Sequence, residues 1–261
     1  MDGEKILAGL KTQWLGKFFS HINETTSTND YAKKLFEEGK LEHGAVIIAD
    51  RQTAGRGRME RRWHSDGGLC MTVCVRFSGF APGELISVTL AAGVAVANAL
   101  RKLCDAPIYV KYPNDIIANG KKLGGILTEL KGKEPRMVLL GIGVNVFGES
   151  FHEEIADTAV SLRQLGVGSG IDIDIDIDIE MTAIAIINGM EIMMDLFRES
   201  GFKAALPLWN DINCTLGNDL TVAFPNGRTI KGTAKEIGED GALLIDTGEG
   251  LRRVTSGDIF Q

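Results

Sequence analysis

The chain has 261 residues, and its 28 Lys and Arg against 35 Asp and Glu give a formal net charge of −7. With 44% hydrophobic and 24% charged residues it is neither disordered nor fibrous, and its length suits one large domain or a medium domain plus a small one. The acidic balance argues against general binding to duplex DNA, whereas 32 glycines beside 6 prolines indicate many tight turns or close backbone approaches.

The first third of the chain predicts alternating helices and strands. A short amphipathic helix is expected over 6–17 and a strand over 18–23. N-cap residue types at 27–30 and a C-terminal Gly39 predict a helix between them. Strands are expected over 45–49 and 69–77, on either side of a long polar segment.

The middle of the chain begins with its least polar stretch, over 85–100. This stretch contains three polar residues and is too short to span a bilayer, so it predicts a buried helix, and the N-terminus has no signal-peptide pattern. A short strand over 108–110 and strands over 123–130 and 136–146 follow, with Asn119-Gly120 predicting a hairpin. We therefore expect a protein without a membrane span.

The last third predicts helices over 180–199 and 202–209, and then a change of composition. Short alternating runs separated by turn residues over 220–259 indicate a small β-barrel, so we expect domains over 1–212 and 213–261. The run Ile171 to Glu180 alternates Ile with acidic residues. It lacks the spacing of a calcium-binding EF-hand loop and is interpreted as a solvated connector or the frayed start of the next helix.

The cysteines and histidines predict no structural metal. Cys70, Cys74, Cys104 and Cys214 form no C-x-x-C pair, and reduced thiols packed as small hydrophobes are favoured over a zinc site or a disulfide. The four histidines are scattered along the chain. Thiols of this kind predict a cytoplasmic protein.

The segment from Arg51 to Arg62 is the strongest candidate for an anion site. It carries five arginines against Glu60 alone, and Gly55 and Gly57 are interleaved with the arginines. Glycines let backbone N–H groups approach a phosphate, and guanidinium groups bind its oxygens in pairs. The alternative is a solvated basic loop, and no P-loop pattern occurs in the chain.

Two further segments hold candidate polar side chains. In Lys111 to Asp115, Pro113 fixes a turn, and Asn114 and Asp115 could orient a ligand, a magnesium ion or the turn itself. Lys122 precedes Gly124-Gly125, which indicate close approach by a ligand or another backbone; the alternative for Lys122 is a surface lysine beside a hairpin. The segment 141–145 is a weak half of a dinucleotide fingerprint.

Taken in order, five segments resemble biotin–protein ligase over essentially the whole chain. They are STND at 27–30, QTAGRGR at 52–58 with Trp63, KYPND at 111–115, KKLGGIL at 121–127 with Glu129, and GIGVNV at 141–146. The resemblance implies an α+β fold, in which helices flank a mixed sheet of the class II synthetase-like biotin–lipoate ligase type. A small C-terminal barrel like that of Src-homology-3 domains would follow.

The same resemblance implies an ATP-dependent ligase with biotin, ATP and magnesium as its small molecules. Biotin would be activated as biotinyl-5′-AMP and passed to a lysine of a biotin carboxyl carrier protein. Many relatives are homodimers, so a homodimer is possible. Only about 20 residues precede the first strand, so we expect the short form of the ligase, with no DNA-binding domain.

The resemblance also implies roles for individual residues. The 27–29 segment and Gln52 would bind the ureido ring of biotin, and the Arg56–Arg58 loop would close over the adenylate. Lys122 would lie beside the biotin carboxylate and the α-phosphate as the main electrostatic stabiliser, and Asn145 would lie near adenine or ribose. Catalytic roles would fall to Lys122, Arg56, Arg58 and Lys111, a tentative metal-ligand role to Asp115, and binding roles to Ser27, Thr28, Asn29, Gln52, Gly55, Arg56, Gly57, Arg58, Trp63, Asn114, Asp115, Lys122, Gly124, Gly125 and Asn145.

Two departures from the family pattern keep alternatives open. Glu60 stands where relatives often have Gly, so the loop could be stiffer, and Tyr112 stands where Trp is common, which keeps an aromatic wall. A lipoate or octanoate ligase is one alternative, although its R-R-x-S-G-G-G stretch is not found. A non-catalytic biotin or nucleotide sensor is the other, with Glu60 as its only support.

Overall fold

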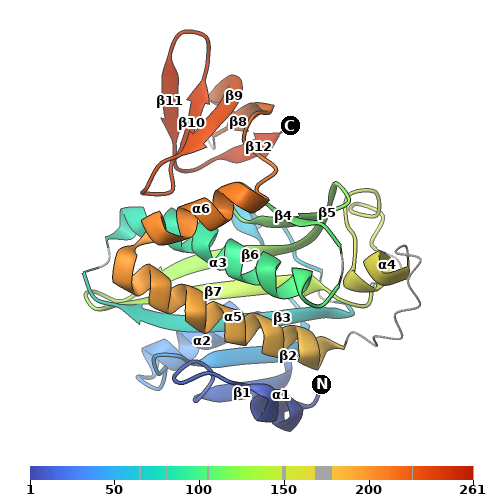
Figure 1. Cartoon of the computed structure of the whole chain (residues 1–261). Helices are drawn as coiled ribbons and strands as arrows, with labels where there is room; N and C mark the ends of the chain where they lie inside the picture. Colours follow the sequence, from blue (N-terminus) through green and yellow to red (C-terminus); the bar gives the residue numbers. More distant parts are fainter. Residues whose placement is uncertain are drawn as a thin grey trace.

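The computed structural model describes residues 1–260 except 65, 80, 105, 149–150, 168–177 and 225. A seven-stranded mixed sheet runs through the larger part, in the order β1-β2-β3-β7-β6-β5-β4 (Figure 1). Its β1–β2 pair is parallel and the other pairs are antiparallel. The strands are β1 (Phe19–Thr25), β2 (Val46–Gln52), β3 (Gly68–Phe77), β4 (Ile108–Lys111), β5 (Asp115–Ala118), β6 (Lys121–Lys131) and β7 (Arg136–Asn145).

Helices cover both faces of this sheet, unequally. On one face lie α3 (Leu85–Arg101), α5 (Ile179–Ser200) and α6 (Phe202–Ile212), with α1 (Gly3–Gly9) against α5. On the other, α2 (Thr28–Glu37) is the crossover that the parallel β1–β2 pair requires. A short helix, α4 (Leu162–Val167), and two 3₁₀ turns (Arg58–Glu60 and Pro82–Glu84) complete this part.

Among the described residues, the stretch Pro82–Arg101, which contains α3, is the one that is long and apolar enough to cross a membrane by length and composition. However, 72% of its apolar 18-residue window is buried inside the protein. It packs against α5, α6 and strands β4 to β6, which accounts for its apolar character. The prediction of a buried core helix is confirmed.

The alternation of side chains along the strands places the site. Val46 and Ile48 belong to the large core under α3 and α5, whereas Ile47 belongs to a smaller core under α2. The small core continues across the sheet through Cys74 and Leu139. It ends where β7 continues as Gly141 and Gly143, because these residues have no side chain to fill the space. A hollow therefore opens on the α2 face of the sheet.

A second, five-stranded antiparallel sheet follows α6, in the order β11-β10-β9-β8-β12. Its strands are β8 (Asp219–Ala223), β9 (Thr229–Ile237), β10 (Leu243–Asp246), β11 (Leu251–Val254) and β12 (Asp258–Phe260). The side chain of Tyr112, buried beside β4, donates a hydrogen bond to the Val254 carbonyl (3.1 Å) and so joins the two parts. The predicted α+β fold with a small C-terminal β domain is confirmed.

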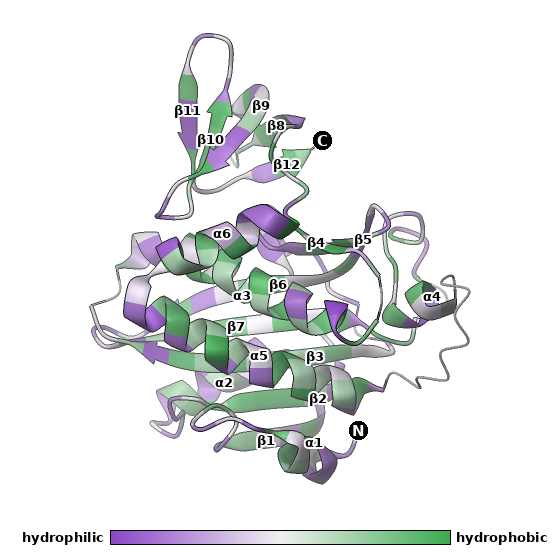
Figure 2. Cartoon of the chain, viewed as in Figure 1, coloured by the Kyte–Doolittle hydropathy of each residue, from purple (hydrophilic) through white to green (hydrophobic). Residues whose placement is uncertain are grey.

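The first helix is shorter than predicted, because the Glu191 carboxylate accepts hydrogen bonds from the backbone of the residues that follow it. Helix α1 ends at Gly9, and the buried Glu191 of α5 accepts the backbone N–H groups of Gln13, Trp14 and Leu15 at 2.6–2.8 Å. Those N–H groups are consequently not available for a helix over 10–17. Figure 2 shows many apolar (green) residues along α3 and α5, and the buried apolar residues of both helices belong to the large core.

Other boundaries agree more closely. Asn119 and Gly120 both have positive φ, as the predicted hairpin requires. Residues 171–177 of the Ile-Asp run lie outside the described residues, and Asp178 caps α5 by accepting the Met181 N–H (2.6 Å). All four cysteines are free thiols, three of them buried.

Candidate active site

A cavity of about 250 Å³ opens on the α2 face of the sheet. The structure brings most of the predicted residues together there, from six separate segments of the chain. The predicted residues that line it are Ser27, Thr28, Asn29, Gln52, Arg56, Gly57, Arg58, Trp63, Asn114, Asp115, Lys122, Gly125 and Asn145.

One end of the cavity is a buried polar network at the N-terminus of α2. Gln52, at the end of β2, accepts a hydrogen bond from the backbone N–H of Thr28 (2.8 Å) through its side-chain oxygen. The Thr72 hydroxyl lies 2.7 Å from Asn29 Oδ1 and 2.8 Å from the Thr28 hydroxyl. Ser27 is the N-cap of α2, yet its side chain makes no hydrogen bond to the helix. These groups present hydroxyl and amide dipoles, without a net charge, to a ligand.

Two glycines of β7 leave room for side chains of this wall. A Cβ atom on Gly141 would lie 2.6 Å from Asn29 Oδ1, and one on Gly143 would lie 2.4 Å from the indole of Trp63. Both separations are far below van der Waals contact. The Trp63 Nε1 atom is buried without an oxygen or nitrogen partner in the described part of the chain and has only the weakly accepting Cys70 thiol beside it, so the wall holds a donor for which a ligand could supply a stronger acceptor.

The arginine-rich loop is an ordered hairpin. Trp63 N–H donates to the Gly55 carbonyl (2.9 Å), and Gly57 N–H donates to the Arg61 carbonyl (2.6 Å). The Arg56 guanidinium forms two hydrogen bonds with the Asp30 carboxylate, of 2.8 and 2.5 Å. That guanidinium holds the pKa of Asp30 below its usual range, against the effect of burial. The fork thus fixes the loop to α2.

At the tip of this hairpin, Met59 and Glu60 both adopt left-handed backbone conformations, with φ of 53° and 60°. That conformation costs a residue with a Cβ atom about 1–2 kcal/mol of conformational free energy, and it does not cost glycine this amount. The expectation that Glu60 changes the loop therefore has a physical basis, because the position requires the geometry that glycine adopts freely.

The base of the tip contacts the C-terminal sheet. Arg58 donates hydrogen bonds to the Gly257 carbonyl (3.1 Å) and to Asn114 Oδ1 (3.4 Å), and burial lowers its pKa. Arg61 donates to Asp258 Oδ1 (2.5 Å). Both partners on the C-terminal side lie at the start of β12 or next to it. The second domain therefore helps to set the position of two cavity arginines.

Lys122 and Asp115 form the other end of the cavity. The Lys122 ammonium lies 2.6 Å from Asp115 Oδ1, and both side chains are partly exposed to the cavity. A Cβ atom on Gly125 would lie 3.3 Å from Lys122 Cε, so this glycine leaves space for the lysine stem. Two hydrogen bonds also fix the backbone of Lys122. Asn145 Nδ2 donates to the Lys122 carbonyl (3.3 Å), and the Lys122 N–H donates to the Thr158 carbonyl (2.7 Å).

Three predicted site residues fall outside the lining. Lys111 lies on the edge strand β4, near Cys214. Gly55 packs under the Trp63 backbone and Gly124 under the Gly143 carbonyl, so both serve backbone packing, the second of the alternatives left open for Gly124. Tyr112, expected as an aromatic wall, is instead buried against Val254, and burial raises its pKa.

Sequence reasoning missed the part of the lining contributed by the segment after β7. Ile155, Thr158 and Ala159 reach the cavity because Lys122 forms an isolated parallel bridge with Ala159. Nothing in their sequence marks them as polar ligands or as a regular element. The other lining residues not assigned a role are Arg61, Arg62, His64, Met71, Ile126, Leu127, Gly141, Ile142 and Gly143.

The arrangement is electrostatically two-sided. A neutral polar pocket at the start of α2 leads to an end where Lys122 pairs with Asp115 and Arg58 contacts Asn114, and Arg56 lines the same cavity from its fork with Asp30 of α2. Such a site suits a ligand with a polar ring at one end and an anion at the other. The clustered guanidinium and ammonium donors can also stabilise charge that develops on phosphate oxygens.

Comparison with known proteins finds matches to both parts of the chain. Residues 22–145 match the model of the Biotin/lipoate A/B protein ligase family, and residues 215–260 match the Biotin protein ligase C terminal domain. The Bifunctional ligase/repressor BirA of Bacillus subtilis (strain 168) is 34% identical over 269 aligned positions, covering 99% of this chain and 78% of its own.

A second relative and a solved structure extend the match. A biotin–acetyl-CoA-carboxylase ligase of Mycobacterium tuberculosis is 31% identical over 243 aligned positions, 91% of this chain and 86% of its own. The structure of the biotin protein ligase from Aquifex aeolicus in complex with biotin and ATP is 29% identical, with a TM-score of 0.77 over 94% of this chain and 98% of that one.

Proposed function

The chain belongs to the biotin/lipoate A/B protein ligase family, and on that premise we propose that the cavity on the α2 face of its sheet is where its reaction takes place. The protein is an ATP-dependent ligase that activates biotin as biotinyl-5′-AMP and transfers the biotinyl group to a protein lysine. The observation that carries the assignment of the site is the two-sided cavity, with neutral hydrogen-bonding groups at one end and Lys122 at the other.

The polar end is suited to the ureido ring of biotin. Ser27 has a hydroxyl that its own helix does not use, and the Trp63 indole N–H is buried without an oxygen or nitrogen acceptor among the described residues. Asn29 differs, because its amide already contacts Thr72, the Leu127 carbonyl and Glu129. We therefore assign Asn29 a positioning role, in which it holds the start of α2 against the sheet.

The cationic end is suited to the first chemical step. An oxygen of the biotin carboxylate attacks the α-phosphorus of ATP, a P–O bond forms, and the bond to pyrophosphate breaks. Negative charge accumulates on the α-phosphate and on the leaving pyrophosphate. Lys122, Arg56 and Arg58 supply fixed positive charge there, which is the largest contribution that a protein makes to such a step.

The second step passes the biotinyl group to an amine. A lysine of the acceptor attacks the carbonyl carbon of biotinyl-5′-AMP, an amide bond forms, and AMP leaves with the electrons of the anhydride bond. We propose that the acceptor is the biotin carboxyl carrier domain of a carboxylase, since a relative is named for acetyl-CoA carboxylase. The hairpin over 55–63 must keep water from the anhydride until that lysine arrives.

Magnesium fits this site only together with ATP. Asp115 is one carboxylate, and one of its oxygens already pairs with Lys122. Magnesium ions bound beside nucleotides commonly use one or two carboxylates plus phosphate oxygens and water. We propose Asp115 as that carboxylate, with the bound ion neutralising pyrophosphate charge.

We also propose a domain boundary, a cellular compartment and an oligomeric state for the enzyme. We place the catalytic domain in residues 1–212 and the C-terminal barrel in 213–261, because the linking residues Asn213 to Asn218 lie between α6 and β8. We also propose that the enzyme works in the cytoplasm, where ATP and carboxylases are found. A homodimer stays a prediction that sedimentation of the purified protein would check.

Mass spectrometry of a carrier domain incubated with this protein, ATP, magnesium and biotin tests the function directly. A mass gain of one biotinyl group, with pyrophosphate release, is the expected result. Tight biotin binding without pyrophosphate release would identify a sensor instead. Pyrophosphate release without a mass gain would retain biotin activation and overturn the choice of acceptor.

A further inference from the structure

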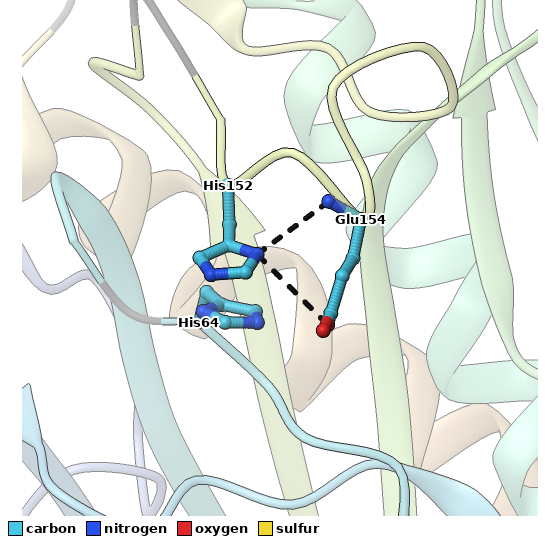
Figure 3. A group of neighbouring side chains, drawn as sticks. All are labelled: His64, His152 and Glu154. Atoms are coloured by element: carbon cyan, nitrogen blue, oxygen red, sulfur yellow. Dashed lines mark hydrogen bonds and ion pairs between the residues drawn. The ribbon is translucent and has the colours of Figure 1, made fainter.

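Three side chains that could bind a metal meet at the edge of the cavity. They are His64, His152 and Glu154, and their ligand atoms all lie within 4.8 Å of one another. Figure 3 shows the two imidazole rings stacked, with the carboxylate beside them. The ring centroids are 5.0 Å apart and the planes differ by 18°. The two histidines are 88 positions apart in the sequence, so the fold creates this cluster.

The contacts within the cluster are weak and leave donor atoms open to solvent. His152 Nδ1 lies 3.9 Å from a Glu154 carboxylate oxygen and 3.5 Å from the Glu154 backbone nitrogen. The side chains of His152 and Glu154 are 55% and 76% exposed, and His64 is partly exposed. An exposed pair of this kind contributes little stability, so packing alone does not account for the grouping.

The donor set has a clear chemical preference. Two imidazole nitrogens and one carboxylate oxygen suit zinc and neighbouring transition metals, whereas magnesium prefers oxygen ligands and keeps several waters. Bonds of about 2.0–2.2 Å to a shared ion require the ligand atoms to lie closer together than the 4.8 Å limit within which they all lie here. Rotation of the exposed Glu154 and His152 side chains can supply that approach.

The cluster joins two segments of the chain that both line the cavity. His64 directly follows Trp63 and itself lines the cavity. On the other side, Ile155, Thr158 and Ala159 line the same cavity just after Glu154. A metal bound to the three ligands would therefore join the end of the arginine-rich hairpin to the segment that pins the Lys122 backbone.

We propose that His64, His152 and Glu154 bind a divalent transition-metal cation of the zinc class, which bridges these two segments at the edge of the cavity. Three protein ligands leave one coordination position to water. The site is separate from the magnesium that enters with ATP, because its donors are chiefly nitrogen. Metal binding rests on these three side chains and not on the ligase reaction.

Titration of the full chain with Co²⁺ in excess Mg²⁺, followed by visible absorption, tests the proposal. The expected result is saturation at one Co²⁺ per chain, with displacement by Zn²⁺. Loss of a ligand should weaken affinity by about tenfold or more in His152→Ala and in Glu154→Gln. His21→Ala is the matched control, since His21 lies 2.9 Å from Asp50 near the N-terminal amine and could itself attract metal.

Each other outcome has a definite meaning. Absence of saturable binding overturns the proposal, and so does equal affinity in the wild type and both ligand variants. Loss of binding in His21→Ala alone assigns the metal to the N-terminal cluster and also overturns it. Circular dichroism of each variant establishes that it is folded, and Glu154→Gln preserves shape at an exposed position.

The bridge itself is tested by limited proteolysis without biotin or ATP. Trypsin should cleave after the exposed Arg61 in the hairpin, and Zn²⁺ should slow this cleavage in the wild type but not in His152→Ala. Protection that is equal in both proteins, or absent from the wild type, contradicts the bridge. The readout does not depend on activity, so it is unaffected if the proposed acceptor is wrong.

Discussion

Lys122 Nζ lies 2.6 Å from Asp115 Oδ1, although the two side chains belong to different strands, β6 and β5. The register of the two strands brings this about, since Asp115 pairs with Gly125 and a bulge between Ile116 and Ile117 shifts the pairing toward Lys122. The carboxylate thus holds the ammonium in place within the cavity before an anionic substrate arrives. This organisation in advance is what electrostatic catalysis requires.

Replacing this lysine should abolish most of the first step. We expect Lys122→Met to lower the rate of biotin-dependent pyrophosphate release by about 10²–10³-fold, the usual effect of removing one positioned donor. Biotin affinity should change much less, because the ureido end is untouched. Lys121→Met is the matched control, since Lys121 is the exposed neighbour on the same strand. Unchanged pyrophosphate release in Lys122→Met would remove Lys122 from the mechanism.

Glu60→Gly should stabilise the protein. Glu60 has φ of 60°, where a residue with a Cβ atom pays about 1–2 kcal/mol. Glycine gains about 0.4–1 kcal/mol of extra entropy in the unfolded chain, so the net gain should be about 0.5–1 kcal/mol. Urea unfolding measures it. Lys34→Gly, at an exposed interior position of α2, should instead lose about 1 kcal/mol. A loss of stability in Glu60→Gly would show that the tip is not strained.

Local patterns in the sequence predicted much of the fold and of the site. The low polarity of 85–100 located α3, helical spacing located α5, and Asn119-Gly120 located a turn, because each signal depends on neighbouring residues. The polar segments at 27–29, 52–58 and 122–125 reach the cavity because each lies where a strand or helix begins or ends. The segment 141–145 belongs to the motifs that resemble the family, but nothing in its sequence indicates that Asn29 and Trp63 pack against Gly141 and Gly143.

What the sequence did not reveal depends on long-range pairing. The Asp30–Arg56 fork and the His64–His152–Glu154 cluster join segments whose spacing forms no pattern. Lys111 was predicted as catalytic, but its strand is at the sheet edge, with β5 between it and β6. The helix expected over 6–17 ends at Gly9, because Glu191, about 180 positions later, accepts hydrogen bonds from the backbone of residues 13–15.

Gly143→Ala should displace Trp63 from the cavity wall. The added Cβ atom would lie 2.4 Å from the indole, and relief of such crowding typically costs about 1–3 kcal/mol. Biotin should bind about tenfold more weakly, and tryptophan emission should shift as the buried indole moves toward water. Gly189→Ala is the matched control, because its Cβ atom would meet Ala95 O at an ordinary 3.6 Å. Native affinity in Gly143→Ala would mean that Trp63 does not contact biotin.

Glu191→Gln should make stability less dependent on pH. Burial opposes the charge of Glu191, but the backbone N–H groups of Leu15, Gln13 and Trp14 outweigh it and hold the pKa of the carboxyl below its ordinary value. A depressed folded-state pKa contributes stability above the unfolded-state pKa, about 4.3, and that contribution is lost as the pH falls through the folded value. Glutamine retains one acceptor oxygen but not the charge, so the variant should be less stable at pH 7 by about 2 kcal/mol.

The difference between the two proteins should therefore shrink as the pH falls below about 4, and urea midpoints from pH 7 down to pH 3 would follow it. Glu199→Gln, at an exposed position on the same helix, should show a far smaller effect at neutral pH. A difference that stays constant across this range would mean that Glu191 stabilises the 13–15 segment by shape alone. A difference that grows toward acid would mean that its folded-state pKa is raised, because only then is its charge a cost to the fold.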